Sequence, residues 1–186
     1  DKKTPTRLYN GMIHPLRNFK IKGAIWYQGE SNVGRPDQYG KLFSTMISEW
    51  RREFGYDFPF YFAQIAPYGQ YNDNSAYLRE AQLHTVSLPR TGMVVTMDIG
   101  NLDDIHPKNK QETGRHLALW ALAKDYDFDT AFSGPIFSKY VIKKDKAYLH
   151  FDHARKGLTT NDGLSPNHFE IAGEDRVFHP TNAVIK

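Results

Sequence analysis

The chain has 186 residues, of which 40% are hydrophobic and 24% charged, and this composition is typical of an ordinary globular domain with a small extension. The net charge of +3 is not concentrated in a basic stripe, so we expect no nucleic-acid partner. No apolar run approaches the roughly 20 residues of a membrane span, so we expect no membrane partner. The absence of cysteine excludes disulfides, thiolate metal ligands and a cysteine nucleophile.

The first two thirds of the chain alternate between apolar, β-rich runs and helical periodicity. In chain order we expect a strand at 21–27, a helix from Pro36 to a stop at Gly55, a strand at 60–65, a helix at 76–87, a strand at 92–98 and a helix at 108–126. The apolar face of the first helix should contain Tyr39, Leu42, Phe43, Met46, Ile47 and Trp50. Strands that alternate with helices predict right-handed crossovers and a parallel sheet.

The pattern changes after Asp127. Short β-like pieces at 139–143, 147–151, 169–172 and 176–178 are separated by Asp, Gly, Asn and Pro, without helical periodicity between them. We therefore predict an α/β domain over residues 1–129 and a β-rich extension over residues 130–186.

Two polar clusters directly follow predicted strands: WYQGESN at 26–32 and DDIH at 103–106. Loops that leave the carboxyl ends of parallel strands converge at one edge of the sheet. His106 is a candidate general base, and Asp103 or Asp104 could fix its tautomer. The alternative is that Asp103 or Asp104 only caps a helix that opens at Pro107.

The cluster after the first strand offers amide donors. Gln28, Gly29 and Asn32 could stabilise a developing oxyanion. Alternatively, Gly29 serves a tight turn, and Glu30 and Asn32 satisfy backbone groups of the loop. Ser31 lacks the glycine two residues later that a nucleophile elbow requires.

Metal and cofactor sites have no support in the sequence. The other histidines show no metal-ligand spacing, and no glycine-rich dinucleotide or phosphate loop is present. We expect no metal and no cofactor.

Several long motifs resemble the sialate O-acetylesterase (sialic acid-specific 9-O-acetylesterase) family of the SGNH hydrolase superfamily. They are LYNGMI at 8–13, IKGAIWYQGESN at 21–32 and DDIHPKNKQETGRHLAL at 103–119, with GLTTNDG at 157–163 and FEIAGEDRVFHPTNAVI at 169–185 resembling the β-rich region that follows. The resemblance implies a flavodoxin-like, three-layer α/β sandwich that lacks its first strand, with a C-terminal β-rich extension. It also implies an esterase that removes acetyl groups from sugars such as 9-O-acetyl sialic acid by Ser-His(-Asp) catalysis, without metal.

The resemblance assigns roles residue by residue. His106 is the implied base, Gln28 is similar to the side-chain oxyanion donor, and Gly29 to Asn32 shape the loop of Gln28. The acid stays open between Asp103 and Asp104. The family carries its nucleophile in an upstream Gly-Gln-Ser-Asn block, which this chain does not contain.

We therefore expect an internal fragment, inactive alone, whose partners are an O-acetylated sugar and the part of the polypeptide that carries the nucleophile. The resemblance favours a periplasmic or secreted location, although this chain contains no signal peptide. Two alternatives remain: a non-catalytic carbohydrate-binding remnant that holds a sugar with Trp26, Tyr27 and the amide-rich loop, or a compact esterase that uses Ser31.

Overall fold

The computed structural model describes residues 4–71, 74–154 and 156–186, and the chain divides into two compact units, Asp1–Phe132 and Ser133–Lys186. The predicted boundary at Asp129 stays a prediction. In the first unit the elements are η1 (Tyr9–Ile13), η2 (His14–Leu16), β1 (Ala24–Tyr27), η3 (Glu30–Asn32), α1 (Pro36–Phe54), β2 (Phe60–Ala63), α2 (Asn74–His84), η4 (Thr85–Ser87), β3 (Thr91–Val94) and α3 (Lys110–Asp125).

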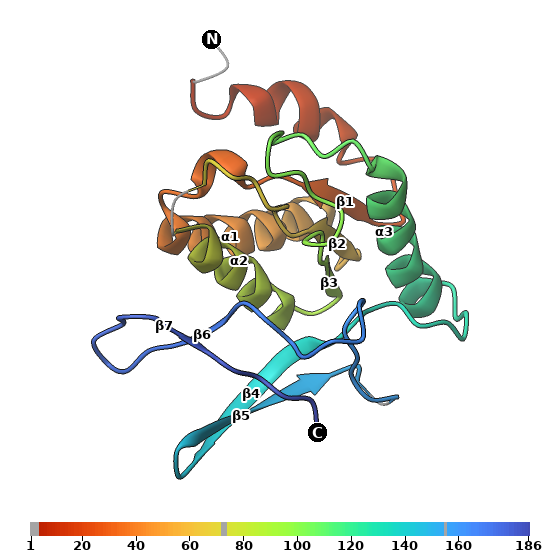
Figure 1. Ribbon diagram of the computed structural model, residues 1–186. Helices are drawn as coiled ribbons and strands as arrows, with labels where there is room; N and C mark the ends of the chain where they lie inside the picture. Colours follow the sequence, from red (N-terminus) through yellow and green to blue (C-terminus); the bar gives the residue numbers. More distant parts are fainter. Residues whose placement is uncertain (1–3, 72–73, 155) are drawn as a thin grey trace. The chain divides into compact units, whose positions relative to one another are not determined.

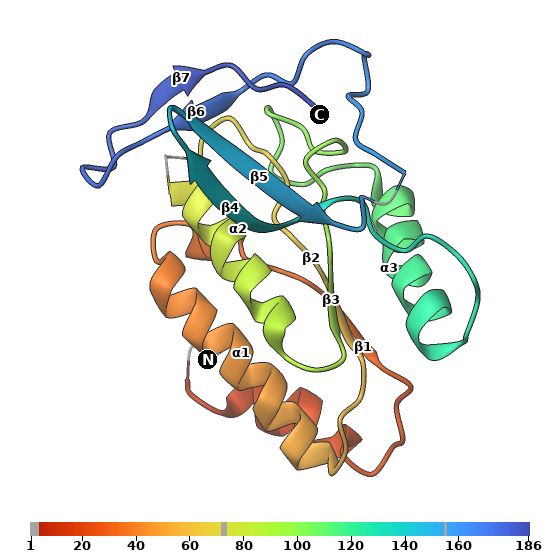
Figure 2. The same cartoon turned by 90° about the horizontal axis from the view of Figure 1, so that it is seen from below.

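The three strands of the first unit form a parallel sheet in the order β1-β2-β3. Tyr27 pairs with Ala63, and Ala63 pairs with Val94, so the strands end side by side. Helices α1 and α2 cover one face of the sheet and α3 covers the other (Figures 1 and 2). The predicted α/β class with a parallel sheet is confirmed.

The α1 face of the sheet carries an aromatic core. Phe43 of α1 lies edge-on to Phe62 of β2, with ring centroids 4.9 Å apart, and stacks near Trp26 of β1. The helix begins with Pro36, whose missing N–H costs nothing at this position, and ends at Gly55 in the left-handed conformation, as predicted. The prediction was wrong for Leu42, which is 57% exposed because it lies beside the buried stripe rather than within it.

The α3 face is centred on Trp120. Its indole packs on Tyr61 of β2 and on Gly92 of β3, which are partners across the strands, and its Nε1 donates to the carbonyl of Met93. The Tyr61 hydroxyl donates to Asp125 at 2.6 Å. This hydrogen bond and the one from Trp120 to Met93 both join α3 to the sheet.

The ends of several elements differ from prediction. β1 begins at Ala24, because the N–H of Ile21 donates to the Tyr56 hydroxyl instead of to a strand partner. α3 begins at Lys110, after Asn109, whose side chain accepts from the N–H of Glu112. The short helices η1 and η2 were not predicted.

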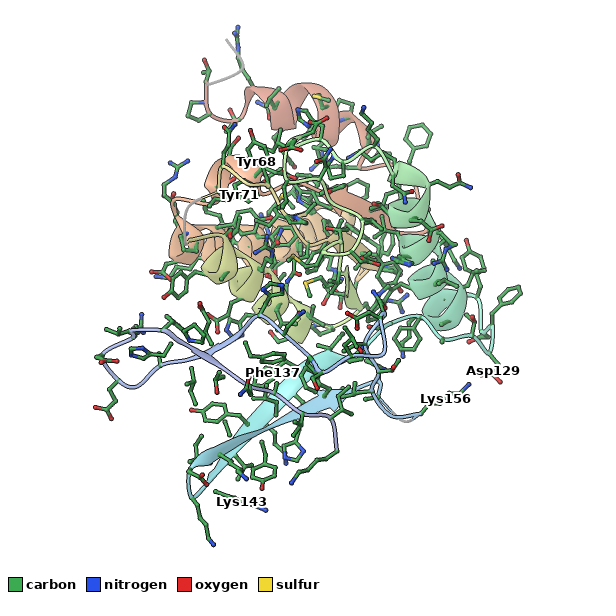
Figure 3. All side chains as sticks on the ribbon, in the orientation of Figure 1. Tyr68, Tyr71, Asp129, Phe137, Lys143 and Lys156 are labelled. Carbon is green, nitrogen blue, oxygen red and sulfur yellow. The ribbon has the colours of Figure 1, made fainter. Side chains whose placement is uncertain are left out.

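The second unit contains two antiparallel hairpins, which confirms its predicted β-rich character. β4 (Ile136–Lys143) pairs with β5 (Lys146–Asp152), and β6 (Phe169–Ile171) pairs with β7 (His179–Thr181). Phe137 and Lys143 mark the two ends of β4 in Figure 3. The strand predicted at 176–178 is wrong, because Arg176 adopts a positive φ of 55° in a turn and donates its N–H to Gly173.

Helices of membrane-spanning length and apolarity do not occur in the described ranges. This finding concerns those residues alone.

The contact between Gly92 and Trp120 predicts a steric effect. A Cβ at Gly92 would lie 2.4 Å from Trp120 Cε3, so Gly92→Ala should lower the free energy of unfolding by about 1–3 kcal/mol or more through overpacking. Gly114→Ala is the matched control, because Gly114 is an exposed helical glycine with no atom within 4 Å of the added Cβ, and it should gain about 1 kcal/mol. Denaturant midpoints at a constant m-value measure both changes, and equal midpoints would contradict this packing.

Candidate active site

Contacts at the carboxyl edge of the sheet join the loops that follow β2 and β3, and they join the end of β1 to the start of α3. The N–H of Gly69, in the loop after β2, donates to the carbonyl of Leu102, in the loop after β3, at 2.7 Å. The ammonium group of Lys110, the first residue of α3, lies 4.7 Å from the ring centroid of Tyr27, the last residue of β1. The two polar clusters identified in the sequence are therefore at the same edge, as expected for parallel strands.

The turn after β1 is held by buried side chains from two helices. The carbonyl of Gln28 accepts hydrogen bonds from the Tyr39 hydroxyl of α1 at 3.0 Å and from Gln82 Nε2 of α2 at 3.3 Å. Gln82 Oε1 in turn accepts from the N–H of Ile65, just after β2, at 2.9 Å. Burial raises the pKa of Tyr39, which keeps its hydroxyl protonated as a donor at neutral pH.

Gly29 makes this packing possible. Its φ of 154° is disfavoured for residues with a side chain, and an added Cβ would lie 2.8 Å from Ile65 Cγ2 and 3.0 Å from Gln82 Nε2. The expected tight turn at Gly29 is therefore also a site of close approach between the loop and α2.

The side chain of Gln28 is oriented by its own loop. Gln28 Nε2 donates to Asn32 Oδ1 at 2.8 Å, and Asn32 ends the short helix η3. A primary amide has two N–H donors, so one remains after this bond. The pair thus holds a half-exposed amide whose second N–H can serve a ligand.

Tyrosines line the turn and were missed in the sequence. Tyr68 and Tyr71, in the loop after β2, lie beside each other with ring centroids 5.3 Å apart (Figure 3). Burial, reinforced by the carboxylate of Glu30, raises the pKa of Tyr71 to about 12, and the same two causes raise the pKa of Tyr27. The hydroxyls of Tyr71 and Tyr27 are therefore neutral at physiological pH.

Among the residues around the turn that the sequence analysis did not identify, only Gln82 could have been recognised from its position in the sequence. Gln82 follows Leu78 by four residues, so it occupies a core position of α2 despite being polar. A glutamine at such a position needs buried partners. Its partners, Gln28 and Ile65, lie just after two different strands and could not be identified from the sequence spacing.

The loop of His106 is organised by local hydrogen bonds. The N–H of His106 donates to Asp104 Oδ1 at 2.9 Å, and the N–H of Asp103 donates to Asn101 Oδ1 at 2.9 Å. The interpretation that Asp103 or Asp104 caps a helix opening at Pro107 is wrong, because α3 starts three residues later and is capped by Asn109. His106 is exposed, and within the described residues its imidazole makes no hydrogen bond to either aspartate.

Ser31 and Trp26, on which the two alternative functions depend, lie in different environments. Ser31 is exposed and forms no hydrogen bond with His106 in the part of the chain that the structure describes. Trp26 is partly buried and packs against Phe43 and Trp50, which disfavours the alternative in which its ring holds a sugar. No group of three His, Cys, Asp or Glu residues that could hold a metal ion occurs among the described positions.

The chain is similar to known carbohydrate esterases. A family model described as carbohydrate esterase, sialic acid-specific acetylesterase, matches residues 2–123. The sialate O-acetylesterase of Mus musculus is 33% identical over 175 residues, covering 80% of this chain and 32% of the relative, and the Homo sapiens enzyme is 31% identical, covering 78% and 32%. The chain thus spans about a third of the length of these relatives.

A solved structure extends the comparison to the fold. The crystal structure of a carbohydrate acetylesterase from Xanthomonas citri matches with a TM-score of 0.93 and 42% sequence identity. It covers 99% of this chain, which corresponds to 44% of the neighbour.

The close approach at Gly29 predicts a local effect on stability. Gly29→Ala should lower the free energy of unfolding by roughly 1–3 kcal/mol, because the new methyl group strains the backbone and displaces Ile65 or Gln82. Gly34→Ala, in the same loop but with open space around it, should change stability by less than about 1 kcal/mol. Thermal and denaturant unfolding measure the difference, and similar losses from both would show that Gly29 is not held against α2.

Proposed function

Because the chain belongs to the sialic acid-specific acetylesterase family of carbohydrate esterases, we propose that the whole protein hydrolyses acetyl esters on sugars such as 9-O-acetyl sialic acid. One observation within this chain carries the proposal. A half-exposed amide, held by Asn32 and by the turn after β1, lies at the same sheet edge as the exposed His106.

In the proposed reaction His106 is the general base. It removes the proton from a serine Oγ, which attacks the acetyl carbonyl, and it gives that proton to the ester oxygen of the sugar as the bond from this oxygen to the acetyl carbon breaks. The same base then takes a proton from water, which attacks the acyl-enzyme; the bond from Oγ to the acetyl carbon breaks, Oγ regains a proton and acetate leaves. Asp103 or Asp104 stabilises the imidazolium; the family pattern leaves this choice open.

Gln28 is the proposed side-chain donor to the oxyanion. Its first N–H is bound to Asn32 Oδ1, which fixes the plane of the amide before the substrate arrives. The second N–H is then preorganised for the charge that develops on the carbonyl oxygen in the transition state. Glu30 and Gly29 shape this loop, Gly29 by the close approach to α2.

The nucleophile is proposed to lie outside residues 1–186. The chain spans about a third of its mammalian relatives, and no Gly-Gln-Ser-Asn block occurs in it. Ile25, in the middle of β1, is 71% exposed, and α3 packs mainly on β2 and β3. An apolar strand residue left uncovered in this way supports an additional element beside β1 in the whole protein, and we propose that this element carries the serine.

Substitutions at the base and at its acid partner test the mechanism in the complete esterase. His106→Ala should lower kcat by about 10²–10⁴ because it removes the proton acceptor. Asp103→Asn and Asp104→Asn should cause unequal losses, since only one carboxylate can orient the imidazole. Asparagine at position 104 keeps an oxygen that can accept from the N–H of His106, so the loop is retained and only the charge is lost. Small and equal losses from both aspartates would show that they do not act on His106.

The oxyanion role of Gln28 has its own test. Gln28→Ala in the complete esterase should lower kcat by about 10²–10³, while KM changes little, because the donor acts on charge that develops only in the transition state. Melting temperatures measured on the same samples separate catalysis from folding. An unchanged kcat in a destabilised protein would remove Gln28 from the mechanism.

A further inference from the structure

We propose that Gln82 of α2 is a positioning residue, which fixes the orientation of Gln28 by clamping the turn after β1 to the end of β2. The inference rests on the proposed oxyanion role of Gln28 and extends it to a residue that is buried beneath the turn. The side chain of Gln82 is completely buried, so it acts through the backbone atoms that it contacts.

The two hydrogen bonds of the Gln82 side chain, which we call the clamp, lie where the pairing of β1 with β2 stops. The last registered pair between β1 and β2 is Tyr27 with Ala63, and the backbones that follow are no longer joined by the ladder. Gln82 bridges them with one amide: its Nε2 donates to the carbonyl of Gln28, and its Oε1 accepts from the N–H of Ile65. A single planar group therefore extends the link between the two strands beyond the sheet.

The clamp also controls where the side chain of Gln28 points. Tyr39 donates to the same carbonyl from α1, so two helices hold the peptide that leaves Gln28. Gly29 has no side chain, and its space is limited by Gln82 Nε2 itself. The backbone carbonyl of Gln28 is held by Tyr39 and Gln82, and its side-chain amide is held by Asn32 Oδ1. These bonds together set the direction in which the second N–H of the amide points.

Loss of the clamp should affect catalysis more than binding. Gln82→Met preserves the length and burial of the side chain but removes both hydrogen bonds, so the turn is held by Tyr39 alone. Because a misplacement of about 1 Å can cost on the order of 10²-fold in rate, we expect kcat to fall about 10- to 100-fold with little change in KM.

The chain offers a matched control in Gln64. This glutamine is also buried just after β2, and its Nε2 donates to the carbonyl of Arg79 in α2, whereas no hydrogen bond joins its side chain to the turn after β1 among the described residues. Gln64→Met should reduce stability in the same way but leave kcat per folded molecule unchanged. Equal effects of the two variants on kcat would overturn the inference.

A double-mutant cycle provides the decisive readout in the complete esterase, with an acetylated sugar as substrate. If Gln82 acts through Gln28, the variant with both Gln28→Ala and Gln82→Met should be no slower than Gln28→Ala alone. Additive losses would show that Gln82 affects turnover by another route and would overturn the proposal. An unchanged kcat in Gln28→Ala itself would instead refute the proposed function, so the two failures are distinguishable.

Gln82→Glu keeps the test available if the methionine variant does not fold. An ionised carboxylate can accept from the N–H of Ile65 but has no hydrogen for the carbonyl of Gln28, whereas the protonated acid has one. The ratio of kcat between this variant and the wild type should therefore rise as pH falls through the pKa of the introduced carboxyl. A ratio that does not change with pH would contradict the clamp.

Discussion

The backbone ladder between β1 and β2 stops at Tyr27 and Ala63, and buried side chains hold the turn that follows β1. The carbonyl of Gln28 is the central acceptor, because it receives donors from Tyr39 of α1 and from Gln82 of α2. An unpaired carbonyl at this depth would be costly, so both helices must pack correctly for the turn to exist. The aromatic core between α1 and the sheet therefore determines the geometry of the turn as well as the stability of the fold.

The two parts of the site differ in how they are fixed. The Gln28 turn depends on bonds between residues far apart in the sequence, whereas the His106 loop uses bonds of Asp104 and Asn101 to N–H groups two residues away. Such short-range turns set a loop's backbone but not the orientation of an exposed imidazole. In our account the proposed oxyanion donor is therefore preorganised within this chain, while the proposed base is aligned by an aspartate and by the serine that it serves.

Local pattern was sufficient to predict the three strands of the parallel sheet, the three long helices and the edge at which the polar clusters meet, but not the last strand of the second unit. Element ends were less predictable, because they depend on tertiary contacts such as the bond from Ile21 to Tyr56 and the cap at Asn109. The same limit applies to the site. Gln28 and His106 were proposed from their positions after strands, but the contacts of Gln82 and of the tyrosines after β2 become visible only when three separate segments are brought together.

Covalent labelling of the nucleophile tests the central claim, that this edge supplies the base and the oxyanion donor to a serine elsewhere in the polypeptide. Diethyl 4-nitrophenyl phosphate transfers its phosphoryl group to an activated serine Oγ and releases 4-nitrophenolate, which can be counted, and the modified peptide can be mapped by mass spectrometry. In the complete esterase we predict one label per molecule, on a serine outside residues 1–186, with loss of labelling in His106→Ala. A label on Ser31 would contradict this account and would place the nucleophile in the turn after β1.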